Sequence, residues 1–74
     1  MANVNVKVFD YINDLGCPKQ MVVSPKDANG QYFVTIWNML NGEHCGSGHA
    51  TFEEVYDFLA HYGYFISEEE MPKP

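Results

Sequence analysis

The first fifteen residues carry two hydrophobic periods at once. Val4, Val6 and Val8 alternate with polar residues, which is typical of a strand. A longer apolar set recurs at helical spacing: Val4, Val8, Tyr11, Ile12 and Leu15. Asn3 or Asn5 can cap the start of this set, and the Gly-Cys-Pro sequence that follows it is a stop signal. The longer stripe predicts an N-terminal helix over residues 5–15.

The middle of the chain has the pattern of an antiparallel sheet. Residues 20–24 form a short apolar run that should stop at Pro25, and residues 31–40 carry apolar side chains on both faces of an alternating pattern. We therefore expect residues 31–40 to be the central strand, with helices over at least one side. Asn41-Gly42 favours a tight hairpin, so the chain should return over residues 43–47. The Gly46-Ser47-Gly48 sequence is weak for a strand and indicates a bulge, or a place where another backbone or a partner comes close.

The second helix has the clearest signal in the chain. Thr51 and Glu54 have the spacing of a capping box, and Gly63 is a typical helix end. The apolar face between them consists of Phe52, Val55, Tyr56, Leu59 and Tyr62. Ser67 and Glu70 repeat the capping pattern, which predicts a single helical turn over residues 68–71.

These elements predict an α+β fold in two layers. The expected order is an N-terminal helix, a three-stranded antiparallel meander, a C-terminal helix and a short helical turn, all in one compact domain spanning residues 1–74. A chain of 74 residues has room for one core only. We expect a monomer or a weak dimer.

The distribution of charge is the least ordinary property of the sequence. Four lysines and no arginine stand against ten carboxylates, which gives a net charge of −6. Eight of the carboxylates lie between Asp27 and Pro72, where there is no basic residue. Phosphates are repelled by such a chain, so we expect no direct binding of nucleic acid and no binding to an anionic membrane. The charge indicates a basic protein surface as the partner.

Three groups of carboxylates are candidate partner-binding residues. They are Glu53, Glu54 and Asp57 on the second helix, Glu68, Glu69 and Glu70 on the short turn, and Asp10 and Asp14 one turn apart on the expected first helix. Rows of carboxylates on a compact body resemble the regular negative charge of a phosphate backbone. The alternative is a solvated surface that is acidic for solubility.

Other chemistry has weaker support in the sequence. His44, Cys45 and His49 have part of the spacing of a zinc site but lack a paired Cys-x-x-Cys or His-x-x-x-His, so we expect no metal and no cofactor. Cys17 and Cys45 should be reduced thiols, at least partly buried. No catalytic motif is present, and we expect no enzyme activity. Zinc binding by a small module remains an alternative function.

Tyrosines crowd the last third of the chain. Most of them should belong to the core, but an apolar patch around Tyr56, Tyr62 and Tyr64 is an alternative interaction surface. The sequence contains no apolar run long enough to span a membrane and no basic-then-apolar leader, so we expect a cytoplasmic protein.

The chain as a whole resembles the small acidic anti-CRISPR proteins encoded by phages, in particular inhibitors of type I systems. The resemblance lies in length, in charge, in the expected order of elements, and in clusters such as Glu53-Glu54-x-x-Asp57 and Glu68-Glu69-Glu70. It implies a protein that occupies the DNA-binding groove of a CRISPR effector complex in the bacterial host. The corresponding expectation is an inhibitor that mimics nucleic acid.

Overall fold

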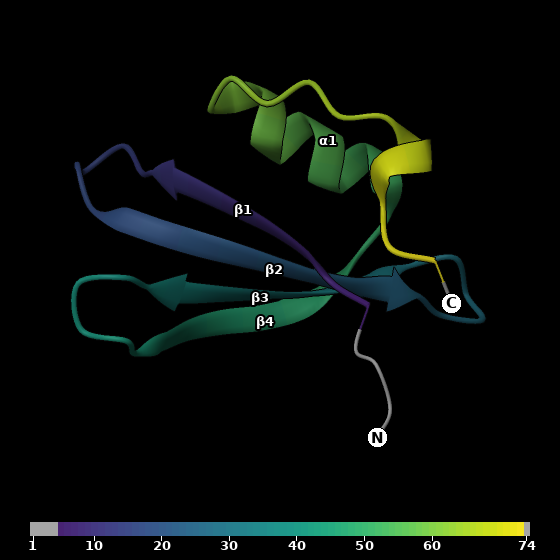
Figure 1. Ribbon diagram of the computed structural model, residues 1–74, viewed down its shortest axis with the longest axis horizontal. Coiled ribbons are helices and arrows are strands. Elements are labelled where there is room, and N and C mark those ends of the chain that lie inside the picture. The colour runs from purple at the N-terminus through teal and green to yellow at the C-terminus, as the bar shows by residue number, and fades with distance from the viewer. Residues whose placement is uncertain (1–4, 74) are drawn as a thin grey trace.

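The computed structural model describes residues 5–73, and it contains one sheet and one α-helix. The strands are β1 (Lys7–Ile12), β2 (Pro18–Lys26), β3 (Tyr32–Asn38) and β4 (His44–Ala50). They are followed by α1 (Phe52–His61) and a 3-10 turn, η1 (Glu68–Glu70). The four strands are antiparallel in the order β1-β2-β3-β4, and Figure 1 shows α1 and the C-terminal segment over one face of the sheet. Within residues 5–73, no element covers the other face, which we call the uncovered face. Val4, Pro74 and the possible cap Asn3 lie outside the described residues.

The predicted N-terminal helix is wrong, because residues 7–12 form β1. Phe9 and Tyr11 are buried against the helix layer, whereas Val8 and Ile12 point to the uncovered face and are exposed. The two sets alternate with a period of two, so the apparent helical stripe mixed residues from opposite faces of a strand. Leu15, the last residue of that stripe, lies in the β1–β2 turn and is 88% exposed.

The sheet therefore has four strands, where three were predicted. β2 is also longer than the predicted run of residues 20–24, because Pro25 does not end it. The pairing register of β2 with β3 shifts between Val23 and Lys26, and this irregularity accommodates a proline that cannot donate to the sheet. β3 has a paired strand on each side and a helix over one of its faces, as predicted.

The helix begins as the sequence predicts. The Thr51 hydroxyl accepts from the Glu54 backbone N–H at 3.2 Å, and the Glu54 carboxylate accepts from the Thr51 backbone N–H at 2.9 Å. These two bonds satisfy amides that a helix N-terminus otherwise leaves unpaired. After α1, Gly63 takes a φ of +90°, a conformation that glycine adopts without steric cost, and the chain turns back over the sheet.

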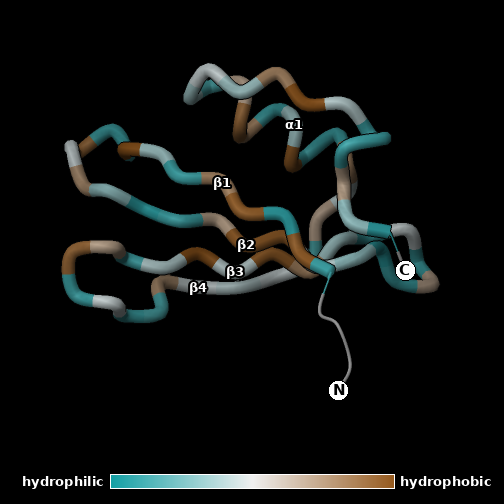
Figure 2. Tube along the Cα trace, in the orientation of Figure 1, coloured by the Kyte–Doolittle hydropathy of each residue, from teal (hydrophilic) through white to brown (hydrophobic). Residues whose placement is uncertain are grey.

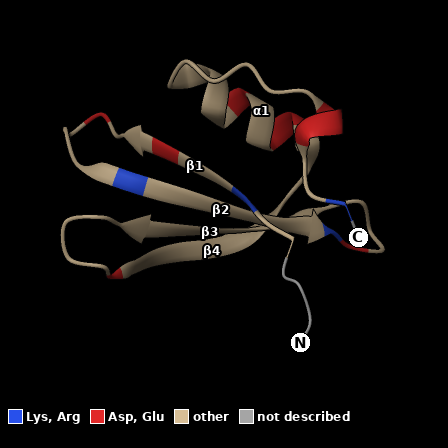
Figure 3. Cartoon of the chain, viewed as in Figure 1, with Lys and Arg blue, Asp and Glu red and all other residues tan. Residues whose placement is uncertain are grey.

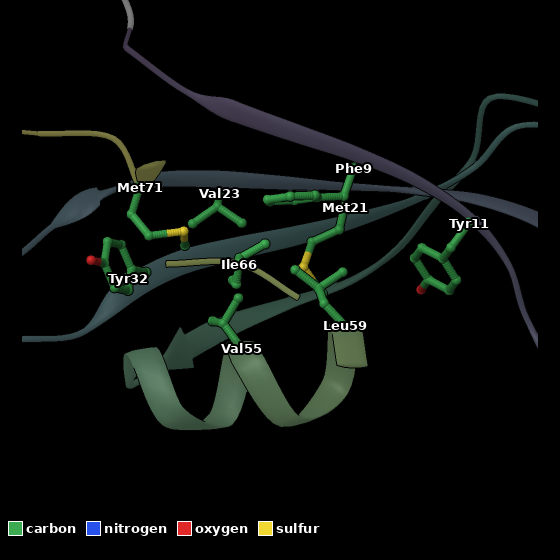
Figure 4. Packing of buried hydrophobic residues seen from close by; sticks show 9 residues of the cluster. All are labelled: Phe9, Tyr11, Met21, Val23, Tyr32, Val55, Leu59, Ile66 and Met71. Atoms are coloured by element: carbon green, nitrogen blue, oxygen red, sulfur yellow. The ribbon is translucent and has the colours of Figure 1, made fainter. Parts of the chain in front are cut away.

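The core lies between the sheet and the α1/C-terminal layer (Figure 4). Its buried side chains are Phe9, Tyr11, Met21, Val23, Tyr32, Val55, Leu59, Ile66 and Met71. They come from β1, β2, β3, α1 and the C-terminal segment. β4 contributes none, because its positions on the core face are Gly46, Gly48 and Ala50.

Candidate binding surfaces

The largest group of carboxylates lies on the helix layer. We define the acidic surface as Glu53, Glu54 and Asp57 of α1 with Glu68, Glu69 and Glu70 of η1. Figure 3 shows both elements on the same side of the sheet. Val55 of α1 and Met71, which directly follows η1, belong to one buried cluster, so hydrophobic packing holds the two acidic elements in one layer. The structure thus places six of the eight predicted residues in one layer.

Lysine neutralises little of this surface. Lys26 Nζ lies 2.9 Å from Glu68 Oε2, and within residues 5–73 this is the one ion pair between a lysine and the acidic surface. The hydrogen bond from Lys26 to Glu68 raises the pKa of the lysine. The backbone N–H of Thr51 holds the pKa of Glu54 below its ordinary value. Both effects favour the charged forms at neutral pH.

Asp10 and Asp14 lie elsewhere, and they do not form a second row. Asp10 lies on the uncovered face of β1, where its Oδ1 accepts from Gln20 Nε2 at 3.1 Å. Asp14 lies in the β1–β2 turn, 3.2 Å from His61 Nε2. Their predicted spacing of one helical turn depended on a helix that does not form here.

The three tyrosines offered as an alternative interaction patch pack largely against the core. The ring of Tyr62 lies 4.6 Å from that of Tyr11, and the ring of Tyr64 lies 5.4 Å from that of Phe9. The Tyr64 hydroxyl donates to the backbone carbonyl of Asp10. Tyr62 and Tyr64 therefore hold the helix layer and the C-terminal segment on β1.

Exposed apolar side chains gather instead on the uncovered sheet face. Direct cross-strand partners share a face, and the pairings Val8–Val22, Val22–Thr35 and Trp37–His44 place the following residues together: Val8, Val22, Phe33, Thr35, Trp37, His44 and His49. The Phe33 ring lies 5.3 Å from the His49 ring, and the Trp37 ring lies 5.2 Å from the His44 ring. The alternation of Phe33 and Trp37 against Tyr32 and Val34 is visible in the sequence, but the lack of a covering helix is not.

A second apolar region lies at one end of the sheet. The β1–β2 and β3–β4 turns are adjacent, since Met39 N–H donates to Pro18 O at 3.0 Å. Figure 2 shows hydrophobic positions at this end, and Leu15 and Leu40 are 88% and 73% exposed.

A groove of about 280 Å³ separates α1 from β4 on the core side of the sheet. Met21, Val34 and Ile36 form its floor, and Val55 and Phe58 form the helix side. Glu54 supplies the one ionisable carboxylate of its lining. The Gly-Ser-Gly segment of β4 borders this groove, and its weak strand character is the one indication of the groove in the sequence.

The histidines and cysteines are dispersed. His44 and His49 lie at opposite ends of β4, and in the described part of the chain no three His, Cys, Asp or Glu side chains are grouped as metal ligands would be. Cys17 is partly buried, as predicted, whereas Cys45 is exposed, with Lys19 Nζ 3.4 Å from its sulfur. The prediction that both thiols are partly buried is wrong for Cys45, because β4 lies at the edge of the sheet.

Comparison of the chain with protein-family models, with curated proteins and with solved structures gives no match in any of the three. Among residues 5–73, no helix has both the length and the apolar character needed to cross a bilayer. Fold and surface chemistry alone therefore define the protein as a small two-layer α+β domain with an acidic helix layer.

Proposed function

We propose that the protein acts by binding, without a catalytic step, and that its acidic surface occupies a basic, nucleic-acid-binding groove of a partner protein. The observation that carries this proposal is the placement of six carboxylates on α1 and η1, with a single lysine paired to them within residues 5–73. Complementary charge accelerates association and selects basic partners.

The most specific form of the proposal is an inhibitor of a type I CRISPR effector complex in a bacterial cytoplasm. Its support is the resemblance in length, charge and acidic clusters to small anti-CRISPR proteins. The expected helix–meander–helix order no longer supports it, because the first element among residues 5–73 is a strand. A competition assay tests this form: a purified type I effector complex should lose binding of its target DNA as the protein is added.

A pair of charge-reversal variants tests the acidic surface itself. Glu53→Lys with Asp57→Lys should weaken partner binding by at least about 100-fold, because two lysines would then face a basic groove in place of two carboxylates. Asp10→Lys with Asp14→Lys changes the net charge by the same amount at residues that are not part of the acidic surface, and should have a much smaller effect. Equal losses in both variants would mean that only the net charge matters.

Salt provides an independent measurement. Binding through exposed charges should fall steeply between about 0.05 and 0.5 M salt, since the Debye length shortens over this range. If the Glu53/Asp57 reversal binds as tightly as the parent protein, the acidic surface is not the binding site.

A second candidate is an apolar protein interface on the uncovered sheet face. The exposure of Phe33 and Trp37 on that face favours it, because tryptophan and other aromatic residues often dominate binding energy. This interface should survive high salt and should be lost in Trp37→Ala. The two candidates are therefore separated by the same salt series.

A further inference from the structure

The groove between α1 and β4 exists because β4 lacks side chains where the core would need them. Gly46 and Gly48 occupy core-face positions opposite Ile36 and Val34. A Cβ atom built on either glycine meets no other atom within 4 Å. Val34 and Ile36 consequently stay only partly buried, and Phe58 of α1 is exposed across the groove.

The backbone of β4 is also open on its outer side. Asn38 N–H donates to Glu43 O and Met39 N–H donates to Pro18 O, so even-numbered residues of β3 bond to β4 and odd-numbered residues bond to β2. In the antiparallel register, Gly46, Gly48 and Ala50 therefore turn their backbone groups toward β3. Ser47 and His49 turn theirs away from the sheet.

The opposite edge of the sheet is different. By the same alternation, Asp10 turns its carbonyl outward from β1, and the Tyr64 hydroxyl donates to it. Tyr64 and Ile66 also border a cavity with Lys7 and Phe9, which places the C-terminal segment beside β1. Within residues 5–73, no corresponding segment bonds to the outer side of β4. Unpaired edges bordered by an apolar groove are the surfaces to which extended peptides add.

We propose that β4 binds an extended segment of a partner protein, which adds to the sheet as a fifth, antiparallel strand and places an apolar side chain in the α1/β4 groove. The backbone groups of Ser47 and His49 would bond to the added strand. The residue opposite Gly48 then points into the groove, because direct partners share a face.

The groove also determines the order of residues in this segment. The residue two positions earlier lies opposite Ala50, close to Glu54, which favours lysine or arginine. The residue two positions later lies opposite Gly46, at the Phe58 end, which favours a second apolar side chain. The expected motif is basic-x-apolar-x-apolar, read from the N-terminus of the peptide.

A second copy of this chain fits the groove poorly. Pairing of two β4 strands would bring Gly46, Gly48 and Ala50 to the core side, and none of these can fill the groove. Two copies would also combine two net charges of −6, which repel each other. A peptide with basic and apolar residues can both fill the groove and avoid charge repulsion, whereas a second copy can do neither.

The binding test uses a panel of capped eight-residue peptides. Lysine occupies the basic position of the motif, and isoleucine, leucine, methionine or phenylalanine occupies each apolar position. Threonine occupies all other positions. Titration followed by two-dimensional NMR should shift the amide signals of Ser47 and His49 and protect these amides from hydrogen exchange. Peptides with serine at the apolar positions, or glutamate at the basic one, should bind at least about tenfold more weakly. If no peptide of the panel affects these amides, the proposal is wrong.

Variants of adjacent residues in β4 distinguish the contribution of the groove to peptide binding from the contribution of the strand edge. Gly48→Ile fills the groove and should reduce peptide affinity at least about tenfold, whereas Ser47→Ile places the same side chain on the opposite face and should retain it. Ser47→Pro removes an outward N–H that the fold does not use, and should abolish binding while the protein stays folded. Glu54→Gln preserves the capping geometry and should weaken only peptides with a basic residue.

Other outcomes would assign the edge differently. A concentration-dependent dimer in sedimentation equilibrium that disappears in Ser47→Pro would show that a second copy is the occupant, and would overturn the proposal. The site is distinct from the acidic surface except for Glu54. Retained partner binding in the Glu53/Asp57 reversal would overturn the proposed function alone, whereas a lack of peptide binding to the parent protein would overturn the edge-strand proposal alone.

Discussion

Replacing two leucines by alanine, one at a time, tests the arrangement of the fold most directly. Leu59 of α1 is 0% exposed, and Leu15 of the β1–β2 turn is 88% exposed. The alternative helical pattern of residues 5–15 would place both side chains in the core. The strand arrangement predicts that Leu59→Ala is severe and that Leu15→Ala has almost no effect.

The magnitudes follow from burial. Removing a fully buried leucine side chain typically costs about 2–5 kcal/mol, because transfer energy is lost and a cavity remains. A domain of 74 residues has a total stability of roughly 4–11 kcal/mol, at about 0.05–0.15 kcal/mol per residue. Leu59→Ala should therefore remove a large part of the stability, whereas an exposed substitution such as Leu15→Ala should stay within about 0.5 kcal/mol.

Urea unfolding followed by circular dichroism measures both changes. With a slope near 1 kcal/mol per molar urea for a small domain, Leu59→Ala should lower the midpoint by about 2–5 M, or unfold the protein without urea. The midpoint of Leu15→Ala should differ from the parent by about 0.5 M or less. Comparable losses in the two variants would refute the assignment of residues 7–12 to a strand and of Leu15 to an exposed turn.

Three further predictions concern a helix cap, a glycine with a positive φ and a hydrogen-bonded carboxylate. Thr51→Ala removes the hydroxyl that accepts from the Glu54 amide, and should lower the free energy of unfolding by about 1 kcal/mol in the same urea assay. Gly63→Ala places a Cβ on backbone with a φ of +90° and should cost about 1–2 kcal/mol, whereas Gly46→Ala, which lacks a positive φ, should cost less. The backbone N–H of Gln31 lowers the pKa of Asp27, so the stabilisation is present above the ordinary value of about 3.9 and is lost as pH falls through the lower folded pKa. Asp27→Asn should therefore show a shallower loss of stability than the parent when unfolding is measured from about pH 5 to pH 2; equal slopes would exclude this contribution.

Short sequence motifs correctly predicted the elements that are bounded by bonds between residues close together in the chain. The capping box of Thr51 and Glu54 located the start of α1, and Asn41-Gly42 located the β3–β4 connection, although β3 ends at Asn38 and not at residue 40 as predicted. Each of these depends on bonds between residues a few positions apart, so the sequence itself contains the determining chemistry. The short turn at η1 belongs to the same class.

The prediction for the N-terminal segment was wrong because the sequence fits both a helical and a strand period, and contacts with distant residues determine which of the two forms. Phe9 pairs with Met21 across the sheet and packs edge-to-face on Tyr64, and Tyr11 packs on Phe58 of α1. These contacts join residues up to 55 positions apart, and a helix over residues 5–15 would not form the β1–β2 pairing. No local pattern in the segment reports them.

The candidate sites were predictable to different degrees. The acidic clusters on α1 and η1 were evident from composition, but their common layer depends on the packing of Val55 and Met71. The glycines of β4 were recognised as weak strand formers, yet the groove beside them depends on the path of α1 across the sheet. Placement of the apolar surfaces likewise required knowing which sheet face α1 covers.

The open edge and the acidic charge can be understood as parts of one arrangement. An unpaired edge strand is prone to pair with another copy, and natural proteins usually protect such edges with bulges, prolines or charged side chains. β4 carries a bulge near His44 but no lysine, carboxylate or proline of its own. Repulsion between molecules of net charge −6 opposes self-pairing at this edge, and the same charge attracts a basic segment to it. Because Gly46 and Gly48 pack no side chain against the core, β4 gains more from an added strand than a well-packed edge would. In the proposed arrangement, the net charge thus opposes pairing with a second copy, and the glycines leave space for the apolar side chains of a basic segment.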